Sequence, residues 1–113
     1  MNAERERKAR NEALFREVNE RVEDVSTGLV GSGEPDSLLV GFVCECGRED
    51  CLEQLEVTRA QYEAVRSHPR RFLVLPDHED ADVARVVERH GHFLVVEKIG
   101  EAAEIAEEHD PRS

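Results

Sequence analysis

The N-terminal part of the chain carries its hydrophobic residues at helical spacing. Between Ala3 and about Val25 there is no Gly or Pro, strong helix formers dominate, and Glu and Arg recur four residues apart. The apolar positions step by three or four residues, and they are Phe15, Val18, Val22, Val25 and Leu29. This spacing predicts a long amphipathic helix with one narrow buried seam. We expect the seam to pack on the protein's own core, with a second copy of the chain or a partner helix as the alternative.

A change of composition separates this helix from the rest of the chain. Residues 31–37 concentrate Gly, Ser, Pro and Asp, which form turns and loops. The pattern predicts an N-terminal amphipathic helix at residues 1–30, a linker at 31–37 and a small domain at 38–113.

The domain begins with a pattern typical of a β-hairpin. The apolar run at residues 38–44 has the length of a strand, and residues 52–57 predict the returning strand. Side chains alternate between the two faces of a strand. The face shared with the first thiols consists of Val40, Phe42, Cys44 and Cys46. The two thiols therefore leave the strand in the same direction.

Further along the chain, helical and strand patterns follow each other. Thr58 and Gln61 form a capping box at the start of a short helix. Residues 71–75 and 92–98 are rich in β-formers and predict two strands. Residues 101–109 predict a final short helix.

The segment between those two strands fits two structures. Its apolar positions follow the helical spacing i, i+3, i+4 and i+7, and they are Val83, Val86, Val87 and His90. This predicts a helix that begins near Asp80 and stops at Gly91. A β-hairpin that turns at residues 90–91 is the alternative, because valine also favours strands. The order of elements predicts an α+β fold, with an N-terminal helix, a small sheet with a Cys-rich hairpin, and flanking helices.

Three cysteines lie within eight residues of the predicted hairpin: Cys44, Cys46 and Cys51. Structural zinc sites use four nitrogen or sulfur ligands, and one short loop can supply three of them. Among the five histidines we choose His78 as the fourth ligand, because it follows a strand in a loop that can reach the hairpin. The sequence therefore predicts a zinc site formed by these four residues.

Other uses of the thiols stay open. Unliganded cysteines pack as small hydrophobic residues. A thiol-based redox sensor would form a reversible disulfide, although the carboxylates of Glu45, Glu49 and Asp50 raise thiol pKa values and disfavour a thiolate. A small zinc-dependent enzyme would keep one coordination position open for water, whereas a metal bound by three thiolates is a poor Lewis acid. A non-enzymatic role is therefore favoured.

Charge narrows the range of partners. The 113 residues contain 26 acidic and 15 basic side chains, which gives a formal net charge of -11. Such a field repels phosphate groups, so nucleic acid is not expected as a partner. No apolar stretch approaches the roughly 18 residues of a membrane span. An odd number of cysteines without an export signal indicates a cytoplasmic protein whose thiols bind metal rather than form disulfides.

Several segments resemble a group of small acidic proteins of high-GC bacteria that are described as hypothetical. The group shares an FVCEC-x4-C segment, here residues 42–46 with Cys51, and a later P-x-H-E segment, here residues 76–79. Where similar sequences have Gly before the histidine, this chain has Asp77. The resemblance spans nearly the whole chain and implies no activity. Together the patterns predict a zinc-stabilised binding or regulatory module that engages a protein partner, or forms a homodimer, through its N-terminal helix.

Overall fold

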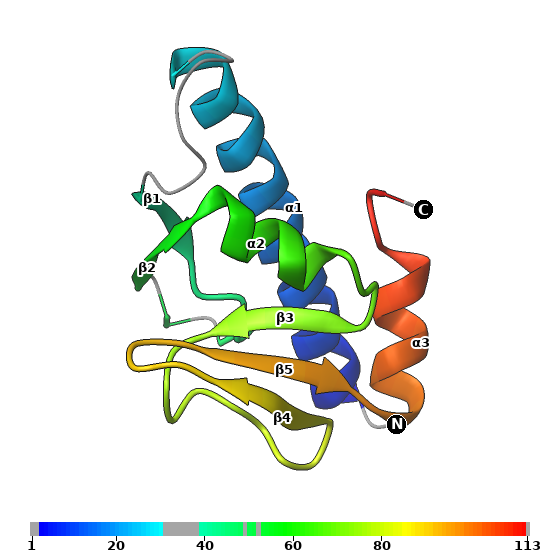
Figure 1. The fold of residues 1–113 in the computed structure, drawn as a ribbon. Helices are drawn as coiled ribbons and strands as arrows, with labels where there is room; N and C mark the ends of the chain where they lie inside the picture. The colour runs from blue at the N-terminus through cyan, green and yellow to red at the C-terminus, as the bar shows by residue number, and fades with distance from the viewer. Residues whose placement is uncertain (1–2, 31–38, 49, 52, 113) are drawn as a thin grey trace.

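The computed structural model describes residues 3–30, 39–48, 50–51 and 53–112, with residues 26–30 by their backbone alone. In this part of the chain, Figure 1 shows a long N-terminal helix, two antiparallel sheets and two shorter helices, so the predicted α+β class is confirmed. The predicted linker at 31–37 lies outside the described residues. The elements are α1 (Ala3–Val30), β1 (Leu39–Val43), β2 (Gln54–Thr58), α2 (Arg59–Arg66), β3 (Arg71–Val74), β4 (Ala84–Arg89), β5 (Leu94–Lys98) and α3 (Gly100–Glu108).

The strands form two sheets rather than one. β1 and β2 form the predicted hairpin, with Phe42 opposite Leu55. The second sheet has the strand order β3-β5-β4 and is antiparallel throughout. The segment from Cys44 to Cys51, which we call the thiol loop, connects the two sheets, because the Glu45 N–H donates to Leu73 O of β3 at 2.8 Å. One hydrophobic core therefore lies between the hairpin, the sheet and α2.

Helix α2 begins as the sequence predicts. The Gln61 N–H donates to Thr58 Oγ1 at 3.0 Å, and the Thr58 N–H donates to Gln61 Oε1 at 2.9 Å. This reciprocal pair satisfies two N–H groups that have no partner inside the helix. Tyr62 and Val65 are buried, and the Tyr62 ring stacks on Phe42 of β1 with ring centroids 4.3 Å apart. The capping box therefore sets the direction in which α2 covers the core.

The helix predicted between residues 80 and 90 is wrong, and the alternative hairpin is correct. Ala84–Arg89 forms β4, which pairs with β5. His90 does not complete a helical face; it is exposed and stacks on Phe93 at 4.2 Å between ring centroids. The register shifts between Val86 and Glu88, which is a β-bulge. The bulge leaves Val86 and Val87, two consecutive residues, both half-buried. The apolar residues of this strand are therefore spaced like those of an amphipathic helix.

Helix α1 is confirmed, but its predicted buried seam is wrong. Val18 and Val25 have exposed fractions of 39% and 60%. Phe15 and Val22 are half-buried, and only the backbone of Leu29 is described. The buried face instead consists of Ala9, Glu12, Ala13, Arg16, Asn19 and Glu23. Polar partners far along the chain, rather than apolar spacing within the helix, decide which side of α1 faces inward.

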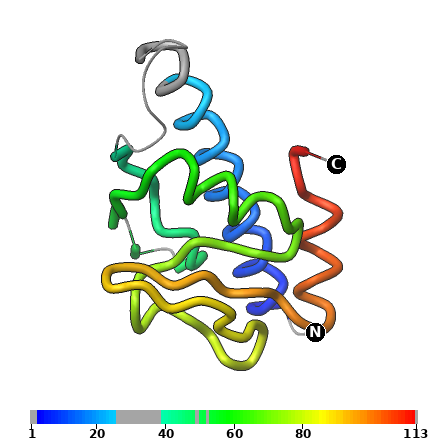
Figure 2. The backbone as a smooth tube through the Cα atoms, viewed as in Figure 1, coloured from blue at the N-terminus to red at the C-terminus, as the bar shows by residue number. Residues whose placement is uncertain are grey.

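Helix α1 spans both sheets, as its path in Figure 2 shows. Its C-terminal half contacts the end of β1, where Asn19 Nδ2 donates to Val43 O at 2.8 Å. Its N-terminal half reaches the second sheet, where Glu12 pairs with Lys98 of β5. Among the described residues, no helix is both long and apolar enough to cross a membrane.

Candidate metal centre

The structure brings the four predicted ligands together. Cys44 and Cys46 follow β1, Cys51 precedes β2, and His78 lies in the loop after β3. Their ligand atoms all lie within 4.8 Å of one another. His78 Nδ1 is 3.7 Å from Cys44 Sγ and 3.5 Å from Cys51 Sγ. Tetrahedral zinc, with Zn–S of about 2.3 Å and Zn–N of about 2.0 Å, holds sulfur and nitrogen about 3.6 Å apart. The cluster could therefore hold a metal ion.

Two tight turns position these ligands. After Cys46 the chain turns at Gly47, whose φ of 76° is in the left-handed region. The Cys51 N–H then donates to Arg48 O at 3.2 Å, which brings the third thiol back to the first two. The turn at Gly47 and the hydrogen bond between Arg48 and Cys51 thus place all three thiols on one short segment of the chain.

The turn before His78 has the features of a type II turn. The His78 N–H donates to Leu75 O at 3.0 Å, with Pro76 and Asp77 between them. Asp77 has a φ of 70°, a conformation that favours glycine and that Asp tolerates better than most residues. The Arg48 guanidinium donates to Asp77 O at 3.2 Å and ties this turn to the thiol loop. The chain therefore reaches the geometry that a glycine would give at position 77.

Each of the three sulfurs accepts a hydrogen bond from the backbone. The Leu75 N–H donates to Cys44 Sγ at 3.2 Å. The hydrogen bond with Cys44 is the main cause that lowers the pKa of Cys46, and a backbone hydrogen bond from Arg48 adds to it. Burial raises the pKa of Cys51, and a backbone hydrogen bond from Glu53 opposes part of that rise. Such donors stabilise a thiolate and orient a metal ligand. These backbone donors therefore favour a thiolate, whereas burial acts against one and raises the pKa of Cys51.

The thiols are buried and share their protons. Cys44, Cys46 and Cys51 have exposed fractions of 2%, 1% and 7%. A hydrogen bond between Cys44 and Cys46 raises the pKa of Cys44 and lowers the pKa of Cys46 to about 4. Burial raises the pKa of Cys51. Hydrogen bonds between the thiols and burial are therefore the largest causes of these pKa shifts.

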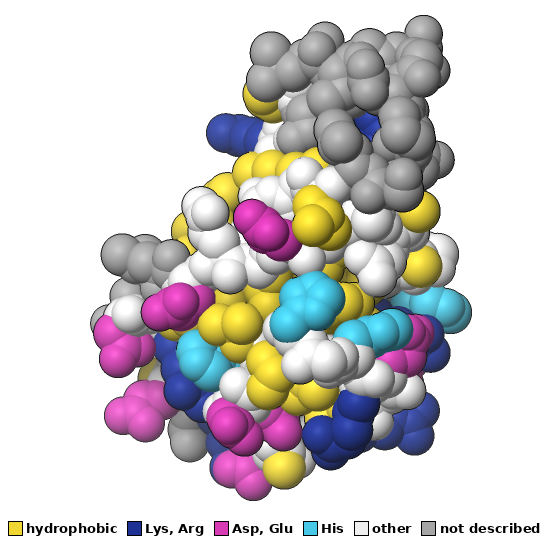
Figure 3. All heavy atoms as spheres, turned by 60° about the vertical axis from the view of Figure 1, so that its left-hand side comes forward, with side chains coloured by type: hydrophobic (Ala, Val, Ile, Leu, Met, Phe, Trp, Pro, Cys, Tyr) yellow, Lys and Arg dark blue, Asp and Glu magenta, His cyan; other side chains and the backbone are white. Residues whose placement is uncertain are grey.

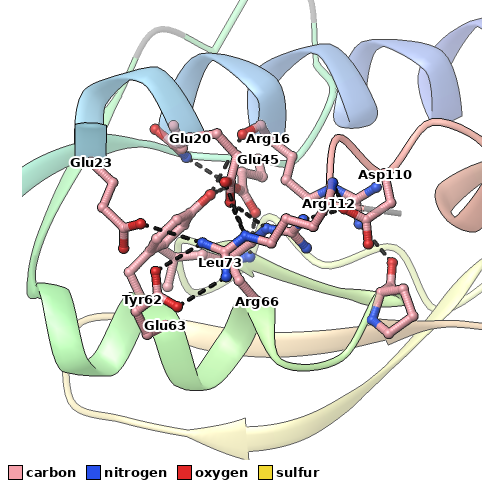
Figure 4. Close-up of polar contacts among 12 residues, drawn as sticks. Arg16, Glu20, Glu23, Glu45, Tyr62, Glu63, Arg66, Leu73, Asp110 and Arg112 are labelled. Carbon is pink, nitrogen blue, oxygen red and sulfur yellow. Dashed lines mark hydrogen bonds and ion pairs between the residues drawn. The ribbon is translucent and has the colours of Figure 1, made fainter. Parts of the chain in front are cut away.

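Glu45, between the first two thiols, belongs to a buried polar network that the sequence did not indicate. Its Oε1 accepts the Leu73 N–H at 2.9 Å. Its Oε2 accepts Asn19 Nδ2 at 2.7 Å. The same oxygen accepts the Tyr62 hydroxyl at 3.3 Å (Figure 4). Burial raises the pKa of Glu45. The available signal was strand alternation, because a pattern that places Cys44 and Cys46 on one face places Glu45 on the other.

Two buried arginines extend this network toward the C-terminus. Arg16 donates to Pro69 O and to Ala106 O, each at 2.6 Å. Arg66 donates to Glu20 Oε1 at 2.7 Å and also pairs with Asp110. Figure 4 shows these side chains converging from α1, α2 and the chain after α3. The network therefore connects the helices to the segment that carries the thiols.

An acidic pair at the edge of this network makes stability depend on pH. Burial and a hydrogen bond to Glu63 raise the pKa of Glu23 from 4.5 to about 8. A hydrogen bond from Arg112 lowers the pKa of Glu63 to about 2. Folded protein thus keeps a proton on Glu23 up to about pH 8, whereas unfolded protein loses it near pH 4.5. The free energy of unfolding is therefore expected to fall as the pH rises from about 5 to about 8.

Replacement of Glu23 isolates its contribution to the pH dependence of the free energy of unfolding. Glu23→Gln should flatten the pH dependence between about pH 5 and 8, measured by urea unfolding at each pH. Glu17→Gln, on the exposed side of the same helix, should leave the wild-type slope. An identical slope in Glu23→Gln and wild type would contradict the assignment.

Comparison of the chain with protein-family models, with curated proteins and with solved structures gave no match. The candidate centre therefore rests on its geometry and on the chemistry of its ligands.

Proposed function

We propose that Cys44, Cys46, Cys51 and His78 bind one zinc ion, and that the protein is a non-enzymatic, zinc-stabilised binding or regulatory module that engages a protein partner. The observation that carries the proposal is the convergence of three sulfurs and one imidazole nitrogen within 4.8 Å. Zinc prefers this ligand set and spacing, whereas Mg²⁺ and Ca²⁺ prefer oxygen ligands. Reduced thiols of this kind fit a reducing compartment, so we propose a cytoplasmic location.

A structural role is favoured over catalysis by the number of ligands. Four protein ligands complete a tetrahedron and leave no position for water or substrate, whereas catalytic zinc keeps one position open. A cavity of about 290 Å³ lies at the start of α3, and none of the four proposed ligands lines it. The metal would therefore hold the thiol loop against the loop at His78.

A thiol-based redox sensor, or a small zinc-dependent enzyme that uses the same cysteines, is the second candidate. The lowered pKa of Cys46, about 4, favours it, because a thiolate is the reactive form. The exposed fraction of Cys46 is 1%, which counts against this second candidate, because an oxidant or a substrate must reach the sulfur. The two candidates differ in whether the thiols are bound and inert or accessible and reactive.

The zinc proposal predicts one equivalent of metal per chain. Protein purified without chelator should contain about one zinc by mass spectrometry, and its thiols should react only after a chelator is added. His78→Ala should weaken zinc retention and lower the midpoint of thermal unfolding, whereas His68→Ala, an exposed histidine after α2, should change neither. Less than about half an equivalent of zinc, together with three freely reactive thiols, would contradict the proposal.

Support for a protein partner comes from the outer side of α1. Leu14, Val18 and Val25 are exposed, and their spacing places them within about 40° of one another around the helix. On the face shown in Figure 3, acidic side chains lie mainly toward the left and lower edges and basic ones mainly toward the lower right, with histidines and hydrophobic side chains between them. We therefore assign the partner to the apolar side of α1.

The oligomeric state of the protein, measured by sedimentation, tests whether the apolar side of α1 binds a second copy of the chain. A dimer that dissociates on Val18→Ser would identify a second copy of the chain as the partner. A monomer at all concentrations would exclude a second copy of the chain as the partner. Ala60→Ser, on the exposed side of α2, is the control.

A further inference from the structure

Helix α1 rests directly on the thiol loop. Asn19 Nδ2 donates to Val43 O at 2.8 Å, and Asn19 Oδ1 accepts the Val43 N–H at 2.8 Å. The same side chain donates to Glu45 Oε2 at 2.7 Å. Gly47 approaches α1 so closely that a Cβ there would lie 2.7 Å from Lys8 O. All of these contacts involve residues next to Cys44 or Cys46, so the position of α1 depends on the conformation of the loop.

The interface that holds α1 is unusually polar. Four of its six buried side chains are polar or charged: Glu12, Arg16, Asn19 and Glu23. The hydrophobic effect is non-directional and tolerates small displacements, whereas hydrogen bonds weaken steeply with distance and angle. Attachment of α1 is therefore sensitive to small movements of the groups that it contacts.

A metal ion would fix those groups. Bonds from zinc to Cys44 and Cys46 hold the backbone on both sides of Glu45, and thereby the acceptors that Asn19 uses. Without the ion, hydrogen bonds, turns and the packing of the buried cysteine side chains hold the loop, and no covalent bond fixes the sulfurs to one another. Metal binding and attachment of α1 therefore favour the same loop conformation.

We propose that metal occupancy of this centre controls the attachment of α1. With zinc bound, Asn19 holds the loop and α1 lies across both sheets. On loss of zinc, α1 detaches while the β3-β5-β4 sheet stays folded. This inference rests on the proposed zinc site and adds a regulated state to it.

Detachment changes which surface the protein presents. The Arg16 guanidinium lies 4.4 Å from the centroid of the Phe72 ring, and it leaves this ring when α1 detaches. Phe72 becomes accessible, and the charges of Arg16 and Glu12 become hydrated, which lowers the cost of release. The metal-free protein thus presents an apolar surface that the zinc-loaded protein covers.

Hydrogen exchange measured by mass spectrometry tests the proposal on the unaltered chain. Zinc-loaded protein should protect the amides of residues 8–24, and chelation should make these amides exchange about tenfold faster or more. The amides of β3 and β5 should stay protected. Unchanged exchange in α1, or equal loss of protection in all elements, would overturn the inference. Absence of zinc from the purified protein would overturn the zinc site itself, so the two failures are distinguishable.

A variant that leaves all four ligands in place tests the reciprocal effect. Asn19→Ala removes the three hydrogen bonds that Asn19 makes with Val43 and Glu45, and leaves the longer bond from Asn11 Nδ2 to Gly47 O in place. One zinc per chain should remain, but α1 should exchange rapidly even when zinc is bound. Because coupling between two equilibria is reciprocal, zinc affinity should fall about tenfold in competition with a chromogenic chelator. Glu17→Ala, on the exposed side of α1, is the control. A zinc affinity equal to that of Glu17→Ala would overturn the inference, and the exchange experiment stands if Asn19→Ala does not fold.

Discussion

Replacement of Lys98 by methionine is expected to destabilise the protein by about 3–5 kcal/mol. Lys98 in β5 pairs with Glu12 in α1, and their side chains are 3% and 4% exposed. Methionine retains much of the apolar stem but leaves the Glu12 carboxylate buried without its closest cation. Burial already raises the pKa of Glu12, and Lys98 opposes that effect. The loss should therefore become smaller as the pH falls, because protonation of Glu12 removes its buried charge.

Replacement of both partners should restore most of this stability. The double variant Glu12→Leu with Lys98→Met removes both charges, and its free energy of unfolding should return to within about 1.5 kcal/mol of wild type. Glu6→Gln breaks the exposed pair with Arg10 on the same helix and should change stability by less than about 1 kcal/mol. Urea unfolding measures all three variants. A Lys98→Met loss no larger than that of Glu6→Gln would show that the pair contributes little to the attachment of α1.

Short-range patterns predicted much of the fold and the whole candidate site. The capping box of Thr58 and Gln61 depends on residues three apart, and the hairpin depends on alternation within two adjacent strands. The choice of His78 required only that a loop follow a strand, which holds for β3. The capping box, the hairpin and the position of each ligand beside a strand are local in sequence, so one chain is sufficient to predict them. The meeting of His78 with Cys44, 34 positions away, followed from the types of ligand that zinc requires.

The inward side of α1 could not be predicted in the same way. Its partners lie far along the chain: Glu12 and Lys98 are 86 positions apart, and Arg16 and Ala106 are 90 apart. Apolar spacing within the helix pointed to the opposite side, because a buried polar face carries no periodic signal of its own. The helix predicted between residues 80 and 90 was wrong for a related reason. The β-bulge between Val86 and Glu88 depends on the register of β4 with β5, which the sequence of this segment alone does not contain.

Glu45 explains why the metal centre and the polar network are close together. Strand alternation directs its side chain away from the thiols on either side, and its three donors come from α1, α2 and β3. Its backbone N–H also donates to Leu73 O. One residue thus connects the loop that carries the proposed metal ligands to three elements. A change in that loop therefore reaches the helices without passing through the hydrophobic core.

Gly47→Ala is expected to destabilise the protein by about 2–5 kcal/mol, because two costs combine at this position. Its φ of 76° strains any residue with a Cβ, which costs about 1–2 kcal/mol. The added Cβ would also meet Glu12 Cγ and would lie 2.7 Å from Lys8 O. Because Lys8 O belongs to the backbone of α1, the helix or the thiol loop must move to admit it.

Substitutions at two other glycines separate the cost of backbone strain from the cost of steric contact. Gly100 has a φ of 59° with nothing within 4 Å of an added Cβ, so Gly100→Ala should show the strain alone, about 1–2 kcal/mol. Gly91 has neither a positive φ nor a neighbour within 4 Å, so Gly91→Ala should stay within about 0.5 kcal/mol of wild type. In thermal and urea unfolding, Gly47→Ala should therefore be the least stable of the three variants, Gly100→Ala intermediate and Gly91→Ala the most stable. Equal losses at Gly47 and Gly100 would mean that α1 and the thiol loop separate at little cost, and that their contact at Gly47 contributes little to the fold.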